Sequence, residues 1–233
     1  MPHITQDSWK MFNQISSTYD RINRILSLGM DHGWRKKVAQ NLPAKKNLRI
    51  LDLATGTGDQ LISLFENGVS IQKASGIDLA KDMLAIAKEK IAQKLYKDKI
   101  DFFHVDAQKL PFADKTFDAA TFSFGIRNVP NPLQSLQEIY RTLKPQGKCL
   151  ILEFSLPPQP IRGAYLIYLR YILPRIGAFF SKSQNAYSYL NQTIETFPSG
   201  DAFALLMKQA SFNKIAIHPM ALGAVTLYVG VKT

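Results

Sequence analysis

The chain shows two patterns of apolar and polar residues. One has the spacing of an amphipathic helix, and the other is the unbroken apolar run of a buried strand. Residues 6–40 place apolar side chains on one helical face, namely Phe12, Ile15, Tyr19, Ile22 and Leu26. Short apolar runs then alternate with amphipathic segments. The runs that predict strands are 48–54, 73–78, 100–106, 116–125 and 147–154, and the helical segments between them are 60–67, 80–95 and 131–144. This alternation predicts an α/β fold with a parallel sheet covered on both faces.

The C-terminal third interrupts the alternation. Residues 155–198 are rich in Tyr, Leu, Ile and Pro and predict a mostly helical insertion. Ser199 is then expected to cap a helix that ends near Ser211. Residues 213–220 and 224–232 predict two further strands, and the short joint between them allows only antiparallel pairing. The sheet should therefore end in an antiparallel hairpin.

These elements predict one domain over residues 1–233, a length that suits a single sizeable core. Five parallel strands and the hairpin make a doubly wound, mostly parallel seven-stranded sheet of the Rossmann-like kind. The N-terminal helices within residues 1–45 and the insertion at 155–198 stand outside the alternation. We expect both segments to cover a substrate site, the insertion as a lid.

Composition narrows the setting. Cys149 is the single cysteine, so no internal disulfide can form, and nothing suggests secretion. The N-terminal segment lacks the apolar stretch of a signal peptide, and no run reaches the roughly 18 apolar residues of a membrane span. A cytoplasmic protein is therefore expected. The histidines His32, His104 and His218 are isolated, so we predict no metal site.

The net charge of +11 favours an anionic partner. Residues 160–182 combine four Lys/Arg and no acid with a strongly apolar stretch, which is more typical of a membrane surface than of a nucleic-acid arm. The alternative is a solvated basic face without a partner. No nucleic acid is expected, because the sequence shows no basic cluster beyond Arg35, Lys36 and Lys37 and no appended nucleic-acid motif.

The candidate chemistry begins in the segment LDLATGTGD, residues 51–59, at the end of the first predicted strand. Gly56 and Gly58 let the backbone turn sharply and approach a ligand closely. A dinucleotide site would place a third glycine where Leu61 stands. Asp52 would instead suit a ligand with a cationic end, such as S-adenosylmethionine, if it points into the pocket. The alternative for the segment is an ordinary strand-to-helix turn.

Two further acids follow neighbouring strands. Asp78 ends the second strand, where a carboxylate can accept both ribose hydroxyls of an adenosine. It could equally cap the helix that begins near Ala80. Asp106 and Ala107 follow the third strand, where a polar side chain and a backbone amide could meet an adenine edge. Asp106 taken alone is more often a loop residue.

Longer segments resemble a known family. The order DLATGTGD, GIDLAKDML, DAQKLPFADKTFD, LKPQGKCLILEF is similar to class I S-adenosylmethionine-dependent methyltransferases, and FGIRN and YSYL resemble the ubiquinone/menaquinone biosynthesis C-methyltransferases over nearly the whole chain. The resemblance implies S-adenosylmethionine as cofactor and a polyprenylated quinol as substrate. The residues that it implies contact the cofactor are Thr57, Asp78, Asp106, Ala107 and Ser123. Ala54 and Gln146 stand where the wider class usually has glycine.

The implied reaction transfers a methyl group to a ring carbon, most naturally converting demethylmenaquinol to menaquinol. A fixed cation beside a phenolic oxygen would favour the reactive anion, and Arg127, next to Asn128, is our candidate for it. The alternative is that Arg127 only pins a loop. Tyr187 and Tyr189 are candidates for the substrate pocket or for the core.

Other functions stay open on the sequence alone. They are methylation of another small molecule or of RNA, a nicotinamide-dependent dehydrogenase, and a non-catalytic adenosine-binding module. Asp52 and Leu61 speak against the dehydrogenase. The oligomeric state is also open, with a homodimer as one option.

Overall fold

The computed structural model describes residues 7–172, 175 and 184–233, and seven strands within them form one sheet. The strands are β1 Leu48–Leu53, β2 Ile71–Asp78, β3 Ile100–His104, β4 Phe117–Ser123, β5 Leu143–Phe154, β6 Asn213–Met220 and β7 Val225–Val231. Their order is β3-β2-β1-β4-β5-β7-β6, with β1 to β5 parallel and β7 antiparallel to both its neighbours. The predicted sheet and its C-terminal hairpin are confirmed.

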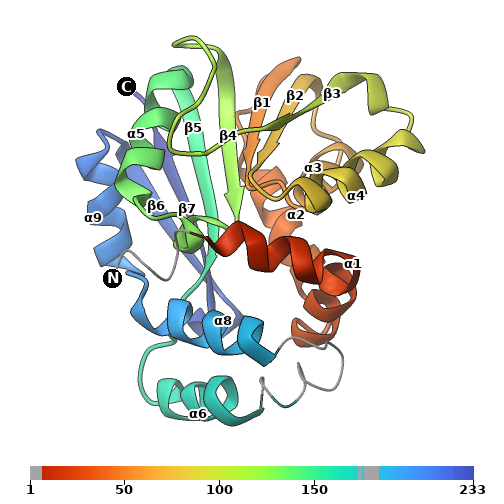
Figure 1. The fold of residues 1–233 in the computed structure, drawn as a ribbon. Helices are drawn as coiled ribbons and strands as arrows, with labels where there is room; N and C mark the ends of the chain where they lie inside the picture. The colour runs from red at the N-terminus through yellow and green to blue at the C-terminus, as the bar shows by residue number, and fades with distance from the viewer. Residues whose placement is uncertain (1–6, 173–174, 176–183) are drawn as a thin grey trace.

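Helices cover both faces of this sheet (Figure 1). One face carries α2 Asp31–Asn41, α3 Asp59–Glu66 and α4 Lys81–Ala92, and the other carries α5 Pro132–Thr142 and α9 Asp201–Gln209. Along β1, Ile50 packs with the first group and Leu51 with the second, and both are fully buried. Burial on both faces is why the sequence of this strand is a continuous apolar run and not an alternating one.

The boundaries of several helices differ from those expected. The helical pattern of residues 6–40 is divided into α1 Ser8–Leu26 and α2, because Leu28 and Gly29 take left-handed backbone angles with φ 51° and 76°. Asn131 caps α5 as predicted and accepts a 3.1 Å hydrogen bond from the backbone of Gln134. The expected cap at Ser199 is wrong, since Gly200 is the residue before α9.

A third group of helices lies beyond the carboxyl ends of the parallel strands (Figure 1). It contains α1, α6 Ile161–Ile167 with the π-helical turn Tyr168–Ile172, and α8 Gln184–Thr196. A small core of Ile22, Leu169 and Ile194 joins these three segments. The insertion is thus mostly helical where it is described. None of the helices in the described part of the chain is both long and apolar enough to cross a membrane.

Candidate active site

The glycine-rich turn joins β1 to α3 at the point where the strand order reverses, which is where ligands bind in open α/β sheets. Gly56 has φ 55°, and a Cβ placed there would meet no atom closer than 4.0 Å, so its backbone borders open space. Gly58 has φ 87°, and a Cβ there would lie 3.3 Å from that of Ala87. Gly58 therefore allows the turn to pack closely on α4, whereas Gly56 leaves the backbone open to a ligand.

The side chain of Asp78, at the end of β2, is bonded to the turn that follows β1. Its Oδ2 accepts a 2.8 Å bond from the Gly56 amide and its Oδ1 a 2.8 Å bond from the Ala80 amide. Burial raises the pKa of this carboxyl despite these bonds. Asp78 lines a cavity beside Gly56, and its bond to the Ala80 amide reaches the residue before α4 and not an amide of the helix's first turn.

This first cavity has a volume of about 130 Å³. Six of the candidate residues line it: Gly56, Asp78, Asp106, Ala107, Ser123 and Asn128. Residues of α1 close its other side, namely Ser8, Trp9, Phe12 and Tyr19. Side chains beside the cavity are held in place. Asp106 accepts a 2.8 Å bond from the Gln108 amide, and Ser123 donates a 2.9 Å bond to the buried Gln60.

Three other candidates do not line the cavity: Asp52 in β1, and Thr57 and Gly58 in the turn itself. Asp52 is 1% exposed and accepts hydroxyl bonds from Thr55 at 2.7 Å and from Thr121 at 2.6 Å. Burial raises its pKa to about 6. Thr57 is also buried and donates a 2.5 Å bond to Asp20 of α1. With Gly58, these residues shape the turn. Their hydrogen bonds attach it to β4 through Thr121 and to α1 through Asp20.

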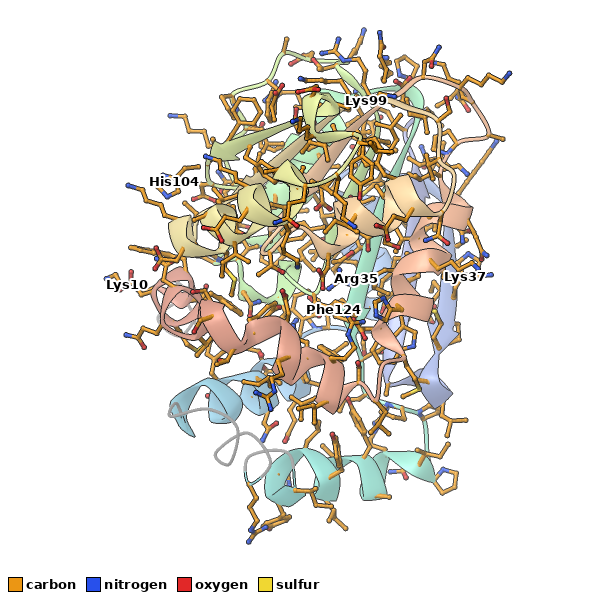
Figure 2. The ribbon with its side chains drawn as sticks, turned by 90° about the vertical axis from the view of Figure 1, so that its right-hand side faces the viewer. Lys10, Arg35, Lys37, Lys99, His104 and Phe124 are labelled. Atoms are coloured by element: carbon orange, nitrogen blue, oxygen red, sulfur yellow. The ribbon has the colours of Figure 1, made fainter. Side chains whose placement is uncertain are left out.

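A second cavity of about 470 Å³ adjoins the first. It is mainly apolar and lies between α1, α2, the π-helical turn, α8 and the strand ends. Phe12, Tyr19 and Phe124 line both cavities. Arg35 of α2 places its guanidinium 5.5 Å from the Phe124 ring centroid, and Figure 2 shows the two side chains together in the centre of the molecule. Phe124 is therefore part of the wall between the two compartments.

Phe124 itself has an unusual backbone. Its φ is 58°, a left-handed value that bulky residues rarely adopt. The next residue is Gly125, where a Cβ would lie only 2.6 Å from that of Ala54. The tight turn directs the Phe124 carbonyl inward, where it accepts a 2.8 Å bond from Arg127 Nη1.

Arg127 lines the second cavity and forms a buried ion pair. Its Nη1 donates to Glu153 Oε1 at 2.6 Å, with the two side chains 5% and 1% exposed. Burial raises the pKa of Glu153, and the charge of Arg127 opposes that rise. Arg127 Nε is buried and has no hydrogen-bond partner among the described residues. Buried donors without a partner are rare in folded proteins, which sets this guanidinium apart from an ordinary structural arginine.

Asn128 connects the covering helices to this site. Its Oδ1 accepts a 3.0 Å bond from the Tyr189 hydroxyl of α8, and its carbonyl accepts a 3.1 Å bond from Ser8 of α1. Tyr189 lines the second cavity beside Arg127. The side chain of Tyr187, the other tyrosine candidate, lies outside the described residues.

Sequence reasoning missed Glu153, Asp20 and Gln60. Glu153 had a signal, since it is an acid within the apolar run of β5, where a charge needs a partner. Asp20 and Gln60 had none, because their partners Thr57 and Ser123 are distant in sequence. In the described ranges no three His, Cys, Asp or Glu side chains gather as they would around a metal ion.

An open sheet of this strand order, with an acid-lined cavity at its switch point, defines a class I methyltransferase fold. A methyltransferase from Thermotoga maritima, described as S-adenosylmethionine-dependent, has a similar structure, with a TM-score of 0.67 at 20% identity over 97% of this chain and 100% of that one. A second such enzyme from Aquifex aeolicus gives a TM-score of 0.62 at 17% identity over 92% of this chain and 98% of that one.

The chain belongs to the ubiE/COQ5 methyltransferase family, whose pattern matches residues 4–232. Two relatives illustrate the similarity. The demethylmenaquinone methyltransferase of Chlorobaculum parvum is 40% identical over 95% of this chain and 91% of its own length. The ubiquinone/menaquinone biosynthesis C-methyltransferase UbiE of Geotalea daltonii is 40% identical over 96% of this chain and 95% of its own.

Proposed function

We propose that the protein transfers a methyl group from S-adenosylmethionine to a ring carbon of a polyprenylated quinol, with demethylmenaquinol as the substrate and menaquinol as the product. One observation carries the proposal: a small cavity at the strand switch point adjoins a large apolar cavity that contains a buried arginine with an unpaired donor. The names of the relatives support the same substrate class.

The residues of the first cavity fit S-adenosylmethionine. Gly56 offers an open backbone approach, and each oxygen of Asp78 accepts a single backbone bond, which leaves capacity for ribose hydroxyls. Asp106 and Ala107 would meet the adenine edge, and Ser123 would border the reacting end. Asp52 and Thr57 would not touch the cofactor but would hold the turn in shape, and Asp52 adds a negative charge when it is ionised.

When bound, S-adenosylmethionine supplies an electrophilic methyl group. Residues of this chain do the rest of the work. Once a water, a nearby carboxylate or a His takes the phenolic proton, Arg127 would favour the resulting phenolate, which raises electron density at the neighbouring ring carbon. Glu153 fixes the guanidinium and balances its charge. Asn128 and Tyr189 would hold the covering helices against the ring.

The apolar lining of the second cavity suits the polyprenyl tail, which cannot remain in water. The insertion and the N-terminal helices would close over both ligands, since the core of α1, the π-helical turn and α8 is continuous. A protein with this substrate would work at the cytoplasmic face of a membrane, in peripheral contact with its lipid.

The direct test incubates the protein with S-adenosylmethionine and each reduced quinone, followed by mass spectrometry of the quinone. We expect a gain of one methyl group on demethylmenaquinol. Arg127→Ala should keep the affinity for S-adenosylmethionine and lose most of the turnover, and Arg49→Ala, an exposed arginine on β1, should change neither. Equilibrium dialysis that showed binding of NAD and none of S-adenosylmethionine would overturn the proposal.

A further inference from the structure

Exposed apolar side chains gather around the second cavity. Nine large apolar residues are exposed among the described residues, and seven of them belong to three segments. The segments are the turn between α1 and α2 at residues 27–30, α6 with its π-helical turn at 161–172, and the turn between β6 and β7 at 221–224. We call these seven residues the apolar rim: Leu28, Met30, Ile161, Ile167, Tyr171, Ile172 and Leu222.

The three segments all border the second cavity. Each of them supplies residues to its lining, such as Met30 from the first, Tyr168 from the second and Ala221 from the third. The β6–β7 turn lies against the start of the insertion, since a Cβ at Gly223 would be 3.0 Å from Pro158. In Figure 2 the α1–α2 turn and the end of the hairpin are both drawn above α6.

Two leucines of the rim occupy positions that leucine ordinarily avoids. Leu28 has φ 51° and is 84% exposed, and Leu222 has φ 56° and is 75% exposed. Asparagine or glycine suits a left-handed turn position better than leucine does. Each leucine therefore combines an unfavourable backbone with an unfavourable contact with water, and neither side chain contributes to the core. Such a combination indicates a surface that is covered by an apolar partner.

The charge around the rim indicates what covers it. Residues 21–37 and 161–175 together hold eight Lys and Arg against one acid, Asp31. Within the part of the chain that the structure describes, two of the eight cations are paired, Arg24 with Asp31 at 2.9 Å and Arg170 with Glu195 at 2.5 Å, so six remain to make the surface positive. Apolar tips flanked by cations match an anionic lipid bilayer, in which the apolar side chains enter the acyl boundary and the cations remain at the headgroups.

We propose that the apolar rim docks on an anionic lipid bilayer and that the cavity opens directly into it. The polyprenyl tail of the substrate then passes from lipid to cavity through the rim without crossing water. This inference rests on the proposed function for the identity of the substrate. The docking itself depends only on the rim and its charge, and it assigns a role to the β6–β7 turn, which lies far in sequence from the insertion.

The docking test uses vesicles without any quinone, made of phosphatidylcholine with or without about one fifth phosphatidylglycerol. The whole chain should float with the anionic vesicles, and added salt should weaken the binding because it screens the cations. Leu28→Asn with Leu222→Asn should lower the vesicle partition coefficient by about tenfold for each leucine, as expected when most of a leucyl side chain leaves the lipid. Asparagine relieves both left-handed positions, so this variant should fold at least as well.

The matched control is Leu95→Asn with Leu205→Asn, two exposed leucines outside the rim, which should bind vesicles as the unchanged protein does. Equal loss in both double variants, or no loss in the rim variant, would overturn the docking. Absence of vesicle binding by the unchanged protein would overturn it too. If ultracentrifugation showed a dimer that only the rim variant breaks, the rim would be an interface between two copies instead of a lipid surface.

An activity measurement separates this inference from the proposed function. Leu222→Asn, at a residue outside the cavity lining, should methylate a short-tailed, water-soluble quinol normally and lose most turnover on a long-tailed quinol embedded in vesicles. Equal turnover of the variant and the unchanged protein on the embedded quinol would refute the passage through the rim. If the unchanged protein methylates neither quinol, the proposed function fails, whereas vesicle flotation still decides the docking.

Discussion

Replacing Glu153 by glutamine changes one charge in the buried pair and keeps its shape. Arg127 then remains in a cavity wall with its charge uncompensated, at a position where its side chain is 5% exposed. Removal of one partner from a buried ion pair costs about 3–5 kcal/mol. Since an ordinary domain has about 5–15 kcal/mol of stability, Glu153→Gln should fold with a clearly lowered urea midpoint.

A double-mutant cycle isolates the pair. Arg127→Met alone leaves the Glu153 carboxylate without its cation, so it should lose a similar amount of stability. Changing both residues removes both charges and should cost less than the sum of the single changes, by about 3 kcal/mol or more. Urea unfolding followed by circular dichroism measures all four proteins. Additive losses within about 0.5 kcal/mol would refute the argument that these two charges balance each other.

The stability of Arg127→Met should depend on pH, and the direction of that dependence tests the assignment of Glu153. Burial raises the pKa of Glu153 even beside the arginine, and loss of the arginine raises it further. The folded variant then holds a proton that the unfolded chain has released, so its stability should fall as pH rises above the ordinary pKa of glutamate. Its deficit relative to the unchanged protein should therefore shrink in acid. A deficit that grows in acid would contradict the assignment.

Three further changes test the rest of the site. Tyr189→Phe removes the 3.0 Å bond to Asn128, worth about 1 kcal/mol, and should raise KM for the quinol several-fold without changing the affinity for S-adenosylmethionine in calorimetry. Asp20→Asn weakens the 2.8 Å contact with Lys90 that fastens α1 over the turn, and should weaken S-adenosylmethionine binding in the same assay. The pKa of Asp52 near 6 predicts that the free energy of unfolding falls by about 2 kcal/mol as pH rises from 4 to 6, a slope that Asp52→Asn should remove in urea titrations.

Much of the fold could be predicted because its signals are local. A strand buried on both faces, such as β1, must be apolar throughout, and the hairpin follows from the few residues between β6 and β7. The expectation for Asp78 also rested on local order, since it ends a strand and precedes a helix. The break after α1 was missed, although Gly29 beside Leu28 is a residue that commonly ends helices.

The candidate site divides along the same line. Asp78 and Asp106 were predicted from their places at or after strand ends and Ser123 from the family resemblance, and all three line one cavity. What the side chains of Asp52 and Thr57 touch depends on residues that come from other elements, and no spacing in the sequence reveals those contacts. The same holds for the pairing of Arg127 with Glu153, since they are 26 residues apart.

The ring of Phe124 has a consequence for how two ligands would share the molecule. Because this side chain lines both cavities, it cannot move to accommodate a ligand in one cavity without changing the shape of the other. Its left-handed backbone and its carbonyl bond to Arg127 leave it few alternative positions. Whatever factor a methyl donor imposes on the affinity for an acceptor, the acceptor must return to the donor in equal measure.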